Sequence, residues 1–201
     1  MIKTVIFDIG NVLVDFRWRK LFHEFGLEGE AFEKLADATV RHPAWEKLDE
    51  GTITKEDAIE AYVKEAPEYR EYIERIYQDM TQILEQYEYA IPWIKELKER
   101  GYRIYILSNW SKPAYEACQD TVLNFLPLVD GVVFSYEEFV IKPDKRIYDI
   151  ICKRYDINPA EAVFLDDTEK NIIAAREYGL HGIVFKNYEQ GKAELDEYLK
   201  H

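Results

Sequence analysis

The sequence has little cysteine, no long apolar run and a deficit of positive charge. Cys118 and Cys152 are its only cysteines, which excludes a disulfide framework and fits a reducing compartment. No apolar run approaches the length of a membrane span, and no basic-then-apolar leader is present, so we expect a cytoplasmic protein. The formal net charge is -13. A surface of this sign repels nucleic acid and anionic membranes, and neither is an expected partner.

What remains is the composition of an ordinary globular protein, in 201 residues that suit one domain or a core with an inserted module. The apolar run Val5-Ile6-Phe7 predicts a strand buried on both faces. Asp8 ends this run, and Gly10 and Asn11, which tolerate a tight turn, follow it. The carboxylate therefore lies at the carboxyl end of a strand, where open α/β sheets bind ligands. Taken alone, Asp8 is equally compatible with a residue that caps a turn.

Residues 16–87 show helical periodicity and no convincing strand. We expect helices over 18–25 and 31–40, a short one around 45–48, one ending before Pro67, and one over 68–87. Thr52 or Thr54 caps the fourth of these helices. A helical block of about seventy residues is too long for a crossover of roughly 10–15 residues. The sequence therefore predicts an inserted helical module at 16–87 and a core made of 1–15 and 88–201.

The rest of the chain alternates strand and helix. Strands are expected at 102–107, 131–134, 162–165 and 182–185, with helices starting near 91, 113, 145 and 168 and a last amphipathic helix at the end. Strict alternation indicates a parallel sheet with right-handed crossovers. The expected fold class is α/β: a Rossmann-like, doubly wound parallel sheet with an inserted all-helical module.

Polar side chains recur where the predicted strands end or the helices begin. They are Asp8, Ser108-Asn109, Lys142 and Asp166-Asp167. Carboxylates from two strands suit Mg²⁺, which prefers oxygen ligands. A hydroxyl, helix-start amides and an ammonium group suit a phosphate. Anion donors beside a cation site are what phosphoryl transfer requires, because its catalysis consists mostly of positioning and charge neutralisation.

Each of these motifs also has an ordinary structural explanation. Lys142-Pro143-Asp144 alone is typical of a solvated helix start, and Asp166-Asp167 of a helix N-terminus. Yet two acids directly after the buried run Val163-Phe164-Leu165 are costly neighbours for a strand, which favours a metal site. For the aromatic side chains of the helical module, Trp18, His42 and Trp45, packing is favoured over lining a substrate pocket.

Four segments in order resemble the motifs of the haloacid dehalogenase superfamily. They are Phe7-Asp8-Ile9-Gly10-Asn11-Val12, Leu107-Ser108-Asn109, Lys142-Pro143-Asp144 and Phe164-Leu165-Asp166-Asp167. The helical block lies where this family inserts its first-type cap, so the resemblance covers nearly the whole chain. The first segment is most similar to the subgroup that includes bacterial α-glucose-1-phosphate phosphatase, and the runs at 42–45 and 51–54 resemble that subgroup's cap less specifically.

The resemblance implies a nucleophile and a metal site. Asp8 corresponds to the nucleophile and to a Mg²⁺ ligand. The carbonyl oxygen of Gly10 and the carboxylate of Asp167 correspond to further ligands, with Asp166 beside them as a ligand or a supporting residue. Asn171 lies one helical turn after Asp167, and we expect it to orient that carboxylate.

The resemblance also implies a phosphate site and a reaction. Ser108 and the backbone of Asn109 correspond to phosphate-binding groups, and Lys142 to the cation that neutralises Asp8 and a phosphate oxygen. The expected protein is a Mg²⁺-dependent phosphatase that hydrolyses a small phosphorylated metabolite, a sugar phosphate such as glucose 1-phosphate, through an aspartyl-phosphate. It is expected to work as a monomer or a homodimer.

One position departs from the family's pattern. Most phosphatases of this superfamily carry a second Asp two residues after the nucleophile as general acid and base, and here that residue is Gly10. Such groups typically contribute about 10²-fold to 10⁴-fold in rate. Without this acid, the rate of hydrolysis should fall least for a leaving group that needs little protonation, such as an anomeric or aryl oxygen. Water, a cap residue, a hydroxyl of the substrate or the nearby Asp15 are the alternatives for this role.

Two other functions remain open. A dehalogenase of this family needs no metal, so the Asp166-Asp167 pair argues against it, as does the lack of an arginine soon after Asp8. A binding or regulatory protein that has lost its chemistry is favoured by Gly10, whereas the intact set of Asp8, Lys142 and Asp167 argues against it.

Overall fold

The core of the molecule is a single parallel sheet. The computed structural model describes residues 1–200. Five strands pair in the order β5-β4-β1-β6-β7, and every pairing is parallel. They are β1 (Thr4–Phe7), β4 (Arg103–Ser108), β5 (Gly131–Phe134), β6 (Ala162–Asp166) and β7 (His181–Val184). The predicted α/β class is confirmed, and β1 lies at the centre of the sheet, where both its edges are paired.

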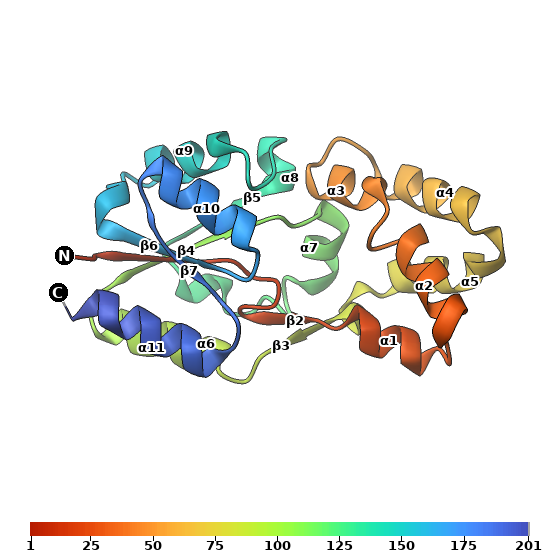
Figure 1. The fold of residues 1–201 in the computed structure, drawn as a ribbon, viewed down its shortest axis with the longest axis horizontal. Helices are drawn as coiled ribbons and strands as arrows, with labels where there is room; N and C mark the ends of the chain where they lie inside the picture. The colour runs from red at the N-terminus through yellow and green to blue at the C-terminus, as the bar shows by residue number, and fades with distance from the viewer. Residues whose placement is uncertain (201) are drawn as a thin grey trace.

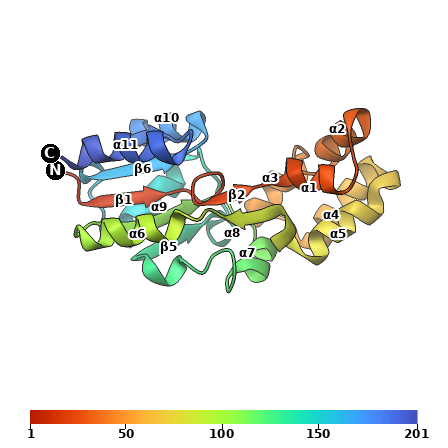
Figure 2. The ribbon, with the colours of Figure 1, turned by 90° about the horizontal axis from the view of Figure 1, so that it is seen from below.

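Helices cover both faces of this sheet (Figures 1 and 2). Successive strand residues point to opposite faces, and Val5 and Phe7 pack in one apolar cluster while Ile6 packs in another. The cluster of Val5 and Phe7 includes side chains of α6 (Ala90–Glu99) and α11 (Tyr188–Leu199). The cluster of Ile6 includes those of α9 (Lys145–Arg154) and α10 (Glu169–Tyr178). This two-sided burial explains why β1 is a continuous apolar run.

The cap consists of five helices beyond one end of the core, as predicted, with the two termini at the far end (Figure 1). They are α1 (Trp18–Glu24), α2 (Gly29–Ala38), α3 (Pro43–Asp49), α4 (Lys55–Glu65) and α5 (Arg70–Gln78). Thr54, one of the two threonines that the sequence allowed, caps α4: its hydroxyl accepts from the Asp57 N–H, and Asp57 Oδ2 accepts from the Thr54 N–H. All helices within residues 1–200 are too short or too polar to traverse a lipid bilayer.

A two-stranded ribbon joins core and cap, and the sequence-based expectation of helix up to residue 87 was wrong. After α5 come a 3₁₀ turn (Met80–Ile83) and β3 (Leu84–Gln86), which pairs antiparallel with β2 (Val14–Phe16). The two segments that cross between the domains thereby satisfy each other's backbone N–H and C=O groups. Strands of three residues carry too little periodicity to be recognised in a sequence.

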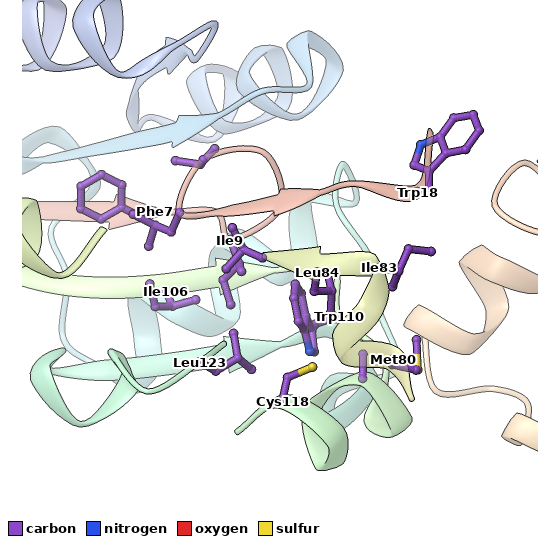
Figure 3. Close-up of a cluster of buried hydrophobic side chains, with 14 of the residues drawn as sticks. Phe7, Ile9, Trp18, Met80, Ile83, Leu84, Ile106, Trp110, Cys118 and Leu123 are labelled. Carbon is purple, nitrogen blue, oxygen red and sulfur yellow. The ribbon is translucent and has the colours of Figure 1, made fainter. Parts of the chain in front are cut away.

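Two short core helices complete the contact with the cap. These are α7 (Lys112–Cys118) and α8 (Ser135–Glu138), the latter not expected from the sequence; 3₁₀ turns lie at Pro67–Tyr69, Leu126–Leu128 and Pro159–Glu161. Helix α8 contacts α3 of the cap. Figure 3 shows Met80 and Ile83 of the 3₁₀ turn and Leu84 of β3 close to Trp110 of the core, within one apolar cluster that spans both parts. Core and cap are therefore packed together through a shared apolar core.

Candidate active site

Asp8 lies at the end of β1 and is 8% exposed. Its Oδ1 accepts hydrogen bonds from the Ile9 N–H (2.7 Å) and the Ser108 hydroxyl (2.6 Å). The ammonium of Lys142 lies 2.9 Å from the same oxygen. Within residues 1–200 no protein donor reaches the other oxygen, Oδ2, which leaves it free to bind or attack. Burial raises the pKa of Asp8 to about 7, although the positive charge of Lys142 and the Ser108 hydrogen bond oppose the rise.

Lys142 is held beneath Asp8 by three acceptors. Its Nζ lies 2.9 Å from Asp8, 2.6 Å from Asp166 Oδ2 and 3.0 Å from the carbonyl oxygen of Leu107. Burial works against the charged form, yet Asp166 and then Asp8 raise the pKa of Lys142 above its usual value. Because its three N–H groups all have acceptors, Lys142 acts on the site through its charge and by fixing Asp8.

Asn109 fixes the backbone of Lys142. Its side-chain amide accepts from the Lys142 N–H (2.8 Å) and donates to the Lys142 carbonyl oxygen (3.1 Å). The structure thus joins the end of β4 to the segment before α9, which are 33 residues apart. Ser108 does not line the cavity described below; its hydroxyl binds Asp8 instead.

The two acids after β6 have different surroundings. Asp166 is fully buried, and both its oxygens are occupied by Lys142, the Thr168 N–H (2.8 Å) and the amide of Asn171 (3.0 and 3.1 Å). The expectation that Asn171 orients Asp167 was therefore wrong, because the start of α10 turns this amide back towards Asp166. Of its two possible roles, Asp166 has the environment of a residue that supports Lys142.

Asn11 holds Asp167, and sequence reasoning missed this contact. The amide of Asn11 donates to Asp167 Oδ2 (2.8 Å), and Thr168 Oγ1 donates to Oδ1 (3.2 Å). Burial raises the pKa of Asp167, and the Asn11 hydrogen bond opposes the rise. Asn11 has φ 55°, a conformation that Asn adopts more readily than most residues. The Gly-Asn pair was the available signal, but its role as a turn did not reveal which side chain it would reach.

The acids form a donor set that fits a hard divalent cation. Asp8, Asp166 and Asp167 each offer an oxygen, and these oxygens all lie within 4.8 Å of one another. Asp166 is fully buried and does not line the cavity described below, so the oxygens that can reach a cation from that space are those of Asp8, Asp167 and the Gly10 carbonyl. Asp8 Oδ2 and the Gly10 carbonyl oxygen accept no hydrogen bond within residues 1–200, and each Asp167 oxygen accepts one. All-oxygen coordination with room for water and a phosphate oxygen is the chemistry of Mg²⁺ sites.

A cavity of about 220 Å³ opens above these groups. Its polar end contains Asp8, Gly10, Asn11, Asn109, Ser111, Asp167 and Thr168. Its apolar wall contains Phe16, Trp45, Met80, Ile83, Leu84, Trp110 and Ala114. Much of this wall comes from the cap and from the segment that joins it to the core. When one group of a ligand binds at the polar end, the cap therefore borders the space for the rest of that ligand. Trp45 is one of its residues, whereas Trp18 and His42 do not line it.

One carboxyl group of the cap also lines the cavity. Asp49 is the last residue of α3 and remains partly exposed to this space. Burial, followed by the negative charges of Glu46 and Asp8, raises its pKa to about 8, against the opposing charge of Lys142. In the sequence, nothing distinguishes Asp49 except that it is an acid shortly before Gly51.

The chain resembles known hydrolases along most of its length. A sequence model described as haloacid dehalogenase-like hydrolase matches residues 2–179. D-ribitol-5-phosphate phosphatase of Bacteroides thetaiotaomicron is 26% identical over 218 residues, with 97% of each chain covered. Sesquiterpene phosphatase astK of Aspergillus oryzae is 26% identical over 181 residues, which cover 90% of this chain and 88% of astK.

A solved structure has the same fold. A HAD family enzyme from Bacteroides thetaiotaomicron, in complex with magnesium and inorganic phosphate, superposes with a TM-score of 0.71 at 22% identity, covering 92% of this chain and 95% of that one. The family model spans far more than half of the chain, and the ordered motifs converge on one site. The chain therefore belongs to the haloacid dehalogenase-like hydrolases.

Proposed function

We propose that this hydrolase is a Mg²⁺-dependent phosphatase that acts on a small phosphorylated metabolite through an aspartyl-phosphate on Asp8. The observation that carries the proposal is the half-engaged carboxylate: Oδ1 of Asp8 is held by three donors, while Oδ2 has none. A nucleophile fixed in this way needs no reorganisation before it attacks. The relatives named as phosphatases, and the neighbour that holds magnesium and phosphate, support the same reaction.

The chain's own groups account for both halves of the reaction. Asp8 Oδ2 attacks the phosphorus in line, and Lys142 and Ser108 keep the carboxylate oriented. Asp8, Asp167 and the Gly10 carbonyl would hold Mg²⁺, which would supply positive charge to neutralise the phosphate oxygens. We expect the backbone N–H of Asn109, which lines the cavity after β4, to bind a phosphate oxygen. Water then hydrolyses the aspartyl-phosphate and regenerates Asp8.

Two classes of leaving group fit different features of the site. The motif resemblance favours a sugar phosphate such as glucose 1-phosphate, whose anomeric oxygen leaves easily. The apolar wall around Trp45 and Leu84 favours a phosphate ester of a largely apolar alcohol, because apolar surfaces bind apolar groups and offer sugar hydroxyls few partners. The similarity to a sesquiterpene phosphatase supports the second class.

The other functions are less well supported by the site. A dehalogenase has no use for the donor set at Asp8 and Asp167. A protein that only binds its ligand has no need for Lys142, whose burial is costly, to hold Asp8 in place. The cytoplasm is the location we propose, in keeping with two free, buried cysteines.

Steady-state hydrolysis of an aryl phosphate tests the proposal. Turnover is expected with Mg²⁺, and is expected to disappear with EDTA and in Asp8→Asn. The control is Asp120→Asn, an exposed acid outside the site that should keep wild-type activity. A folded wild-type protein with no turnover in Mg²⁺, or an active Asp8→Asn variant, contradicts the proposal. Glucose 1-phosphate, ribitol 5-phosphate and an isoprenoid alcohol monophosphate then distinguish the leaving groups by kcat/KM.

A further inference from the structure

The missing acid at Gly10 leaves a specific gap in the site. When the phosphorus–oxygen bond of an alkyl phosphate breaks, an alkoxide of high basicity departs and needs a proton. Three carboxyl groups line the cavity in the part of the chain that the structure describes: Asp8, Asp167 and Asp49. Asp8 is the nucleophile and Asp167 belongs to the cation donor set. Asp15, the near neighbour in sequence, does not line the cavity. Asp49 alone has no other task.

The fold brings Asp49 to the cavity through local features of α3. His42 caps the start of this helix by accepting from the Ala44 N–H, with Pro43 at the first helical position. The helix ends at Asp49, and Gly51 follows with φ +77°, a left-handed conformation that suits a residue just past a helix end. The chain therefore turns away after Asp49, which leaves its side chain at the end of the helix that borders the cavity.

Core residues hold this end of α3 in place. The hydroxyl of Ser135, a fully buried residue of α8, donates to the backbone carbonyl oxygen of Asp49 and accepts from the Trp110 N–H (3.0 Å). Gly51 packs so closely on α8 that a Cβ there would lie 2.5 Å from the carbonyl oxygen of Tyr136. Asp49 belongs to the cap, yet core residues hold the end of the helix that carries it.

The environment of Asp49 favours the protonated form of its carboxyl group. Burial between cap and core disfavours the carboxylate, and the nearby charges of Glu46 and Asp8 disfavour it further, whereas the charge of Lys142 and the side chain of Trp45 oppose these effects. Together these raise the pKa of Asp49 to about 8. A general acid must carry its proton when the reaction begins, and it works best when its pKa lies near the working pH.

We propose that Asp49 is the catalytic acid and base of this site, supplied by the cap in place of the residue missing at Gly10. The inference rests on the proposed phosphatase function. In the first half-reaction Asp8 bonds to phosphorus, the phosphorus–oxygen bond to the alcohol breaks, and the Asp49 proton passes to the departing oxygen. In the second, a water molecule attacks the phosphorus, Asp49 takes a proton from that water, and the bond to Asp8 breaks to release inorganic phosphate. Asp49 ends with the proton it began with.

A leaving-group comparison tests Asp49 directly. The variant is Asp49→Asn, which keeps the shape of the side chain but cannot transfer the proton. The matched control is Glu50→Gln, the same chemical change at the next residue, which does not line the cavity. The readout is kcat/KM for p-nitrophenyl phosphate, whose leaving group needs no proton, and for a simple primary alkyl phosphate, whose leaving group does. We expect Asp49→Asn to lose about 10²-fold or more on the alkyl substrate and only a few-fold on the aryl one.

The pH dependence gives a second signature. In the wild type, kcat/KM for the alkyl phosphate should fall as the pH rises past the pKa of the acid, because the unprotonated form cannot donate. This alkaline fall should vanish in Asp49→Asn and persist in Glu50→Gln. A merely structural role for Asp49 would change both substrates alike and leave the pH profile in place.

The failures are distinguishable. If Asp49→Asn loses the same factor on both substrates, or loses nothing on the alkyl phosphate, the assignment of Asp49 is overturned while the phosphatase function stands. If the wild type hydrolyses neither substrate, the proposed function fails first. Thermal unfolding establishes that the variant is folded, and Asp49→Ser, which also lacks the acid, carries the same comparison if the Asn variant is not.

Discussion

The ammonium of Lys142 lies 2.6 Å from Asp166 and 2.9 Å from Asp8, with all three side chains buried. Removing the cation leaves two buried carboxylates close together without the ammonium group that neutralises them. We expect Lys142→Met to abolish turnover and to lower the free energy of unfolding by about 3–5 kcal/mol, as for other broken buried ion pairs. Urea unfolding followed by circular dichroism measures this change.

The control for Lys142 is Lys145, whose Nζ lies 2.9 Å from Glu177 at the surface, with side chains 60% and 56% exposed. Lys145→Met should cost less than about 1 kcal/mol, because exposed ion pairs contribute little. Equal losses in the two variants would contradict a central role for the buried lysine.

Asn11 provides a test of the cation site. Asn11→Gly removes the amide that holds Asp167 and keeps the backbone, since glycine adopts φ 55° without strain. Loss of a residue that orients a metal ligand typically costs about 10-fold to 100-fold in metal affinity. We expect the Mg²⁺ concentration for half-maximal activity to rise by this factor, with little change in KM for substrate at saturating Mg²⁺. An unchanged Mg²⁺ dependence would mean that Asp167 does not need Asn11.

Alanine variants of Gly51 and Gly26 can distinguish the effect of cap docking from the effect of backbone strain. Both have φ +77°, but a Cβ at Gly26 meets nothing within 4 Å, whereas at Gly51 it would meet the backbone of Tyr136. Gly26→Ala should cost about 1–2 kcal/mol in stability for the left-handed conformation and leave kcat/KM unchanged. Gly51→Ala should cost more and also lower kcat/KM, because the end of α3 must move off α8. Calorimetry and kinetics on the pair measure both effects. Wild-type kcat/KM in Gly51→Ala would show that the contact with α8 is not needed.

The positions of Asp8, Ser108 and the Asp166-Asp167 pair were predictable because a parallel sheet brings the carboxyl ends of its strands to one edge. That rule needs only the strand boundaries, which apolar runs and glycines mark clearly. The rule does not predict which side chains hydrogen-bond to one another. Asn171 was therefore expected to bind Asp167, whereas its amide binds Asp166.

Three features could not be predicted from the sequence, for a different reason: the contact of Asn11, the place of Asp49 at the cavity, and the β2–β3 ribbon. Each depends on how two distant segments meet. The amide of Asn11 reaches an acid 156 residues away. Asp49 lines the cavity at the end of α3, which a core helix contacts. Hydrophobic periodicity in a sequence indicates which face of a helix or strand is apolar, but it does not indicate how a cap packs on its core.

The pH dependence of protein stability should reveal the raised pKa of Asp49 independently of catalysis. The pKa of Asp49 is raised from its ordinary value of 3.8 to about 8 in the folded protein, so the folded state binds the extra proton between these values. Folded-state stability contributed by this group is therefore lost as the pH rises through that window. In EDTA, the unfolding temperature of the wild type should fall more between pH 5 and about pH 8 than that of Asp49→Asn. Glu50→Gln should keep the wild-type slope; identical slopes in the wild type and Asp49→Asn would refute the raised pKa.

Restoring an acid at position 10 tests whether Asp49 and Gly10 are alternatives for one role. A Cβ at Gly10 meets nothing within 4 Å, so a side chain can start there without a clash at its first atom. In the Asp49→Asn background, Gly10→Asp should recover at least about 10-fold of the lost kcat/KM on an alkyl phosphate, a part of what a positioned acid contributes. In the wild-type background it should add little, since the proton is already supplied. Gly10→Asn, which has the same size and no acid, is the control and should not rescue. Rescue by Gly10→Asn, or equal effects of Gly10→Asp in both backgrounds, would mean that the two positions act independently and that the proton reaches the leaving group by another route.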